Sequence, residues 1–103
     1  MTQYKIEFTP KSEEDLSTIY RYIKYNLNEP IIARKILRRL EDSIKQLENF
    51  ANIYPVIIEK FSLEIDLRKK NVKNYIIFFT IENKTVYIIR ILHNKRNWGK
   101  ILK

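Results

Sequence analysis

The sequence predicts an α+β fold in the order β-α-α-β-β-β, in which a helical hairpin packs on one face of a small, mainly antiparallel sheet. Two observations predict this fold. Apolar residues recur at the helical period over residues 16–47, and two apolar runs at 75–81 and 86–92 are too short for buried helices. The chain has 103 residues, of which 45% are hydrophobic, so we expect a single domain over residues 1–103.

The chain is expected to begin with a strand and a helix. Residues 4–8 alternate between apolar and charged side chains, as in a strand with one buried face. Thr9 can cap a helix that begins at Pro10, although Ser12 offers a rival cap. The buried stripe of this helix is expected to comprise Leu16, Ile19, Tyr20, Ile23 and Leu27.

A second helix follows after a very short link. Pro30 can occupy its first position, with Asn28 or Glu29 as the cap. Because the link is so short, the two helices are expected to be antiparallel neighbours. The buried stripe of the second helix is expected to comprise Ala33, Ile36, Leu37, Leu40, Ile44 and Leu47.

The second half of the chain is expected to supply most of the sheet. The run YIIFFTI at 75–81 is apolar at nearly every position, which is typical of an interior strand covered on both faces. The run VYIIRIL at 86–92 has the same character, and the polar link at 82–85 contains an Asn suited to a tight hairpin. A basic strand at 67–72 should precede them and end in a turn at residues 73–74.

Less regular segments flank these strands. Residues 49–57 are expected to form a loop anchored by Phe50, Ile53 and Tyr54, whereas residues 58–66 fit either a loop or a short strand. A short turn at the end of the chain can pack against the body through Trp98, Ile101 and Leu102.

The net charge of +8 comes from the last third of the chain. Residues 67–103 hold ten Lys or Arg against one acid, whereas residues 1–50 hold nine against eight. This asymmetry favours an anionic partner, either a nucleic acid or an acidic protein segment. A solvated surface or protection of an edge strand is the simpler interpretation of the first group of cations. The candidate target-binding cations are Arg68, Lys69, Lys70 and Lys73 in one group and Lys95 and Arg96 in another.

Three further residues are candidates for the site. His93 is the one side chain suited to acid–base chemistry near neutral pH, although a lone His is more often structural. Arg90 lies within an apolar strand, where it either points at a bound target or pairs with an acid of a helix. Trp98 could stack on a base, or it could anchor the end of the chain in the core.

The composition excludes several kinds of site. The absence of Cys removes disulfides, thiolate metal sites and Cys nucleophiles, and it fits a cytoplasmic protein. Carboxylates do not cluster at ligand spacing and no Gly-rich phosphate loop is present, so we expect no metal and no cofactor. No apolar run approaches the ~20 residues that cross a bilayer, so we expect no association with a membrane.

Four segments together resemble the RelE/ParE superfamily of bacterial toxins from type II toxin–antitoxin systems. The segments are YKIEFTPKSEEDLSTIYRYI at 4–23, the helix IARKILRRLEDSI, the hairpin VKNYIIFFTIENKTVYIIRIL and the closing HNKRNW. The closing segment is most similar to the ParE-type or plasmid-stabilisation branch. The resemblance implies a growth-inhibiting toxin that a cognate antitoxin neutralises, in a toxin–antitoxin hetero-oligomer.

The resemblance leaves two targets. ParE-like members inhibit DNA gyrase, whereas RelE-like members are endoribonucleases that cut mRNA on the ribosome. The nuclease members carry an Arg where this chain has Ile76, and their C-terminal catalytic Tyr has no match after residue 87. We therefore expect gyrase inhibition. Ribosome-dependent mRNA cleavage remains an alternative, because cations together with His93 could polarise a phosphate and move a proton. A non-catalytic nucleic-acid-binding module is the other alternative.

Overall fold

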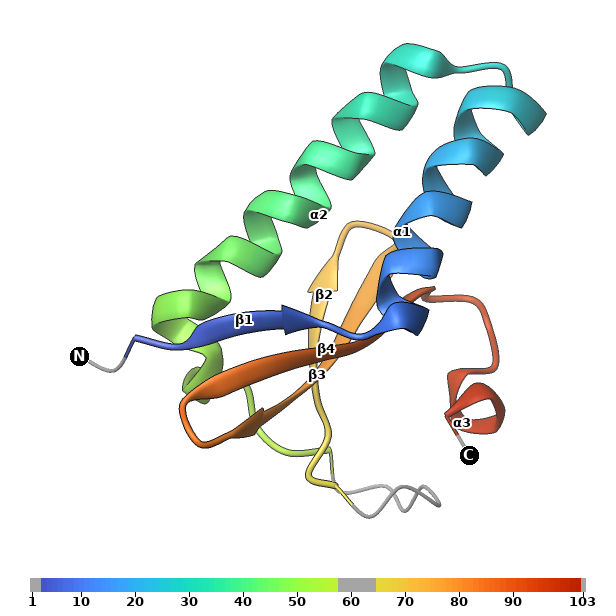
Figure 1. Ribbon diagram of the computed structural model, residues 1–103. Helices are drawn as coiled ribbons and strands as arrows, with labels where there is room; N and C mark the ends of the chain where they lie inside the picture. Colours follow the sequence, from blue (N-terminus) through green and yellow to red (C-terminus); the bar gives the residue numbers. More distant parts are fainter. Residues whose placement is uncertain (1–2, 58–64, 103) are drawn as a thin grey trace.

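The computed structural model describes residues 3–57 and 65–102 and has the predicted order of elements (Figure 1). The elements are β1 (Lys5–Phe8), α1 (Pro10–Arg21), the π-helical turn η1 (Tyr22–Asn26), α2 (Pro30–Phe50), the 3₁₀ turn η2 (Ala51–Ile53), β2 (Arg68–Val72), β3 (Tyr75–Glu82), β4 (Thr85–His93) and α3 (Trp98–Ile101). The sheet has the order β1-β4-β3-β2. β1 and β4 are parallel and the other two pairs are antiparallel, so the predicted α+β fold is confirmed.

The two long helices cover one face of the sheet, and the end of the chain covers the other (Figure 1). On the helix side, Leu40 and Ile44 of α2 pack in one buried cluster with Ile77 of β3. On the opposite side, Phe78 of β3 packs with Leu102 and with the partly buried α3. β3 therefore contributes to two cores, which confirms that it is an interior strand.

β4 contains a bulge that changes which of its side chains face the helices. The register pairs Ile88 and Arg90 with successive residues of β3, so Ile89 is an extra residue. Ile88 packs on the helix side before the bulge, and Ile91 does so after it, three residues later. Simple alternation would have placed these two side chains on opposite faces.

The capping residues position the helical hairpin. The Thr9 hydroxyl accepts a hydrogen bond from the Ser12 amide at 3.2 Å, so Thr9 is the cap of α1 as predicted. Ser12 is buried instead, and its hydroxyl donates to the Thr9 carbonyl at 2.8 Å. The link to α2 passes through Asn28, whose φ of 54° is the left-handed conformation that Asn tolerates. α2 then begins at Pro30, as predicted.

Two predictions about the helical segments were wrong in detail. Leu27 is 51% exposed, because the wider π-helical turn η1 moves it off the stripe that a regular α-helix would continue. Phe50 and Ile53 do not anchor a loop, since they are 49% and 65% exposed. α2 continues through Phe50, so the helical period turns this side chain to solvent, and Ala51 is buried in its place.

The anchor that remains in this segment is Tyr54, which packs against the helix-side cluster and meets the ring of Phe79 edge-on at 6.0 Å. Most of the ambiguous segment 58–66 lies outside the described residues. Val56 forms a single antiparallel bridge with Arg68, just outside the ladder of the sheet. Among the described residues, no helix is both long and apolar enough to cross a membrane.

Candidate functional site

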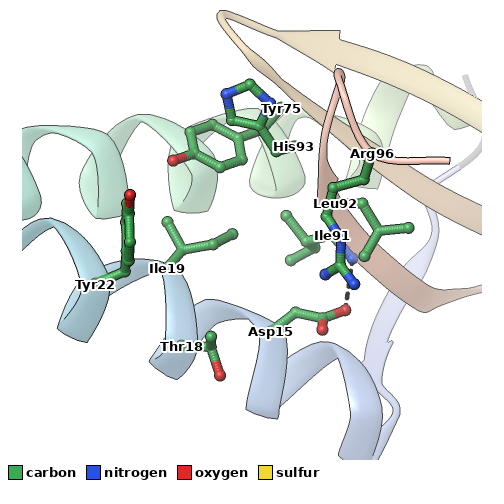
Figure 2. A pocket seen from close by; sticks show the side chains of 9 residues that line it. All are labelled: Asp15, Thr18, Ile19, Tyr22, Tyr75, Ile91, Leu92, His93 and Arg96. Atoms are coloured by element: carbon green, nitrogen blue, oxygen red, sulfur yellow. Dashed lines mark hydrogen bonds between the residues drawn. The ribbon is translucent and has the colours of Figure 1, made fainter. Parts of the chain in front are cut away.

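A pocket of about 470 Å³ opens between α1 and the ends of β3 and β4 (Figure 2). Its walls combine apolar, aromatic and charged side chains. One turn of α1 and the start of η1 form one wall, the paired ends of β3 and β4 form another, and the turn after β4 closes the rim. The lining residues are Asp15, Thr18, Ile19, Tyr22, Tyr75, Ile91, Leu92, His93 and Arg96.

Asp15 lies at one end of the pocket, and its carboxylate accepts three hydrogen bonds from within the protein. Oδ1 accepts a hydrogen bond from Arg90 Nη2 at 2.9 Å, and Oδ2 accepts from Arg90 Nε at 2.8 Å and from the Ile91 amide at 2.9 Å. This hydrogen-bonded carboxylate raises the pKa of Arg90 above its usual value, although partial burial opposes the rise. The pair is structural, because both side chains are mostly buried, with 17% of the Arg90 side chain and 11% of the Asp15 side chain exposed.

Tyr75 and His93 form the other end of the pocket. They are cross-strand partners, with ring centroids 5.3 Å apart and ring planes at 78°. Burial, and secondarily the neighbouring Tyr22, raises the pKa of Tyr75, so its hydroxyl remains protonated at neutral pH. The Nδ1 atom of His93 accepts a hydrogen bond from the Lys95 amide at 3.1 Å. In the neutral ring, Nε2 therefore carries the proton and presents a donor to a ligand.

This arrangement suits binding better than proton transfer. To act as a general base through Nε2, His93 would have to give up the hydrogen bond that Nδ1 accepts. Asp15 already accepts three hydrogen bonds from Arg90 and Ile91, which hold its carboxylate in the charged form and make it unsuited to act as a second acid or base. The pocket offers an apolar floor, two phenols, one imidazole N–H and the exposed cation Arg96, which Figure 2 shows pointing in from the rim.

The structure separates the predicted target-binding cations into two sets. Lys70 is 8% exposed, and its ammonium donates at 2.8 Å both to the Ser43 carbonyl and to Gln46 Oε1 of α2. Arg68 donates through Nη1 to the Tyr54 carbonyl at 2.5 Å. These two residues, together with Arg90, join elements of the fold. Of the two interpretations of Arg90, the ion pair with an acid of a helix is confirmed, because Arg90 pairs with Asp15 of α1.

The remaining predicted residues are exposed or pack against the end of the chain. Lys73, Lys95 and Arg96 are exposed, in the turn after β2 and in the turn after β4. The Lys69 ammonium lies over the Trp98 ring, 5.2 Å from its centroid. Trp98 also packs on Phe78 with ring centroids 5.5 Å apart, so it anchors the end of the chain. The pocket brings together two predicted residues, His93 and Arg96.

Sequence reasoning missed the α1 wall of the pocket. Thr18 and Tyr22 lie on a helix whose apolar stripe alone marked it as a core element. One signal pointed there, since an Arg inside an apolar strand requires a partner and α1 carries several acids in its first turns. In the part of the chain that the structure describes, no three His, Asp or Glu residues are grouped so that they could hold a metal ion.

Comparison with known proteins identifies the family. A family model described as the ParE toxin of type II toxin–antitoxin systems, parDE, matches residues 6–98. The chain belongs to this ParE toxin family. No curated protein matches it by sequence.

Two solved structures share the fold of this ParE-family toxin. The chromosomal ParDE toxin–antitoxin system of P. aeruginosa contains a chain with a TM-score of 0.72 and 22% identity, and the match covers 90% of this chain and 98% of that one. The toxin–antitoxin complex RelBE2 of Mycobacterium tuberculosis contains a chain with a TM-score of 0.62 and 18% identity, with coverage of 90% and 93%. At these identities the likeness concerns the fold.

Proposed function

We propose that this toxin arrests growth by binding DNA gyrase, and that a cognate antitoxin neutralises it. The observation that carries the proposal is the family match over residues 6–98, since the family is that of the ParE toxins. The toxin would act in the cytoplasm, where gyrase and a newly made antitoxin both occur. The structurally similar chains belong to toxin–antitoxin complexes, which supports a hetero-oligomer with an antitoxin for this chain as well.

The geometry of the pocket supports inhibition by binding rather than mRNA cleavage. Cleavage of RNA needs groups that activate the 2′-hydroxyl, stabilise the phosphate and protonate the leaving oxygen. Ile76, at the position where the nuclease members carry an Arg, is 4% exposed and packs in the core on the α3 side of the sheet. His93 is the remaining acid–base candidate, and its Nδ1 is engaged by Lys95. Inhibition by binding needs none of these groups.

The pocket and the exposed cations around it form the surface that we assign to gyrase. Arg96 contributes to the pocket itself, and Lys73 and Lys95 lie in the turns that directly adjoin Tyr75 and His93. An acidic antitoxin segment with apolar side chains would complement the same surface by charge and by burial. Competition between antitoxin and gyrase for this surface accounts for neutralisation.

Two assays on the purified toxin test the proposal. We expect inhibition of DNA supercoiling by gyrase, relieved by the product of the neighbouring gene, and no cleavage of mRNA on programmed ribosomes. Codon-phased cuts with gyrase unaffected would overturn the choice of target. In that case a His93→Ala variant that stops the cuts would assign His93 an acid–base role. Growth on induction, with and without the neighbouring gene, tests the antitoxin separately.

A further inference from the structure

A second cationic surface lies on α2, on residues that do not line the proposed gyrase-binding pocket. Four cations occupy two successive turns of the helix as two pairs spaced four residues apart, and no acid lies between residues 30 and 40. All four side chains are exposed. We call them the α2 cation row: Arg34, Lys35, Arg38 and Arg39.

The α2 cation row has no partner within the described part of the molecule. None of the four side chains forms an ion pair or a side-chain hydrogen bond with a described residue, in contrast to Arg68, Lys70 and Arg90. Two adjoining hollows of about 230 and 520 Å³ run along the row, and Lys35 and Arg38 line both. The row is therefore a continuous grooved surface that keeps a net positive charge, since Asp42 is the one acid that lines it.

The lining of these hollows indicates the class of ligand. Ile31 is the single apolar residue, so the surface offers little to the apolar face of an amphipathic peptide. The lining includes no aromatic ring, which a single-stranded nucleic acid would use for stacking. The larger hollow is also lined by one acid, Asp42, beside three cations of the row. The Ser43 hydroxyl and the Gln46 amide of the same hollow can donate to phosphate oxygens. Cations with polar donors and almost no apolar surface match a duplex phosphate backbone.

The spacing of the cations also fits a duplex. Residues four apart on a helix are separated by about 6 Å along its axis. Each strand of B-DNA rises about 3.4 Å per phosphate, so one step along the row spans about two phosphates. We propose that the α2 cation row binds the phosphate backbone of duplex DNA. The cationic surface itself is independent of the proposed function. The choice of DNA over RNA rests on the proposed function, because gyrase works on DNA.

The position of the row gives this binding a role of its own. α2 packs on one face of the sheet, whereas Trp98 and α3 pack on the other, so the helix that carries the row and the end of the chain lie on opposite sides of the sheet (Figure 1). The pocket, in turn, opens beside α1 (Figure 2). The toxin can thus contact gyrase through the pocket and the DNA held by gyrase through α2, and two linked contacts raise the overall affinity above that of either contact alone.

Fluorescence anisotropy with a labelled duplex DNA tests the inference without gyrase. The variant replaces all four residues of the α2 cation row with Gln, which lowers the net charge from +8 to +4. We expect the slope of log K against log salt concentration to become shallower by about 3 to 4, because each released counterion contributes about 0.9. A control that also carries +4 replaces four lysines outside the row: Lys5→Gln, Lys11→Gln, Lys24→Gln and Lys84→Asn.

The control separates a specific surface from net charge alone. We expect the control to keep most of the salt dependence of the wild type, and equal losses in both variants would overturn the inference. No binding by the wild-type toxin at low salt, or tighter binding to duplex RNA, to single-stranded DNA or to an acidic peptide than to duplex DNA, would also overturn it. Thermal unfolding of both variants verifies that they are folded.

The outcome is independent of the proposed target. DNA binding that depends on the row, in a toxin that leaves gyrase unaffected, would sustain this inference and refute the proposed function. If the toxin does not bind DNA and the variant without the row inhibits gyrase as well as the wild type, the proposed function is supported and this inference is refuted.

Discussion

Asp15 of α1 and Arg90 of β4, 75 residues apart in the sequence, form a two-pronged ion pair at 2.8 and 2.9 Å. The same carboxylate accepts a hydrogen bond from the Ile91 amide. β1 pairs with β4 only as far as Ile88, so beyond that point the edge of β4 has no neighbouring strand. Asp15 takes the place of the missing strand, and Thr9 Oγ1 donates to the Ile88 carbonyl at 2.8 Å just before it.

Removal of the Asp15 carboxylate should destabilise the toxin strongly. Asp15→Ala leaves the mostly buried Arg90 guanidinium without a counter-ion and the Ile91 amide without an acceptor. We expect a loss of about 2–4 kcal/mol in the free energy of unfolding, measured in urea. Asp15→Asn retains one oxygen that can accept a hydrogen bond, so its free energy of unfolding should fall by less. The exposed neighbour provides the control, since Glu14→Ala should change stability by less than about 0.5 kcal/mol. Equal effects of the two alanine variants would refute a structural role for the pair.

Burial of the Lys70 ammonium should appear as a pH dependence of stability. Burial lowers the pKa of Lys70 below its usual value of 10.5. In the interval just below pH 10.5 the unfolded chain then binds a proton that the folded protein has released, so this contribution to the free energy of unfolding rises with pH. The buried charge is most costly at lower pH, where both states are protonated.

The Lys70→Met variant keeps the aliphatic stem and removes the titrating group. The stability of the wild type relative to this variant should increase as pH is raised from 7 toward 10.5. Other groups that titrate there, such as Tyr75 with its raised pKa, are common to both proteins and cancel in the difference. A stability difference that stays constant over this range would show that Lys70 is not desolvated in solution.

Filling the pocket should weaken target binding while the fold persists. Thr18 is exposed and lines the pocket, so the indole of Thr18→Trp should occupy the volume that a target side chain would enter. We expect the inhibitory potency toward gyrase to fall by at least about tenfold, equivalent to about 1.4 kcal/mol. Ser17 is the adjacent exposed residue of α1 outside the lining, and Ser17→Trp should retain full potency. Full potency in both variants would remove the pocket from the proposed mechanism.

The exposed cations among the predicted target-binding residues should contribute to target binding, whereas those that join elements of the fold should contribute to stability. The double variant Lys95→Gln and Arg96→Gln should reduce target binding and change stability by less than about 0.5 kcal/mol, because both side chains are exposed. Arg68→Gln removes a hydrogen bond to the Tyr54 carbonyl and should cost about 1–2 kcal/mol. Urea unfolding and the gyrase assay on both variants test this division. Loss of stability in the double variant, with unchanged stability in Arg68→Gln, would contradict it.

The hairpin turn between β3 and β4 offers a stabilising substitution. Asn83 and Lys84 have φ of 51° and 64°, the left-handed pair of a two-residue hairpin turn. Asn tolerates this conformation, whereas Lys is strained there. Lys84→Gly should raise the free energy of unfolding by about 0.5–1 kcal/mol. Lys5→Gly, inside β1, should lower it instead, so the opposite signs separate relief of strain from a general effect of Gly.

The elements of the fold could be predicted because their signals are local. Thr9 and Pro10 mark the start of α1, and the unalternating run that includes Phe78 and Phe79 marks an interior strand. The site was harder, since it depends on how elements meet. The extra residue Ile89 reverses the facing of the side chains after it, and nothing in a run of apolar residues reveals such a bulge.

The same limit applies to the cations. The group at 68–70 looked uniform in sequence, yet Lys70 turns toward α2 while Lys69 turns toward Trp98. Alternation along a strand predicts that neighbours point to opposite faces, but it does not say which face a helix will cover. The wall formed by Thr18 and Tyr22 was missed for a related reason, because the pocket exists only once α1 lies beside β4.

The pairing of β1 with β4 has a consequence for the folding of the toxin during its synthesis. Lys5 lies opposite Thr85, so the first strand has no partner until the last strand has been made. Contacts between such distant segments form late, and the pocket between α1 and β4 must form with them. A fragment that ends before β4 lacks both the strand that pairs with β1 and one wall of the pocket. We therefore expect a stop codon or frameshift before residue 85 to silence the toxin completely rather than to leave it partly active.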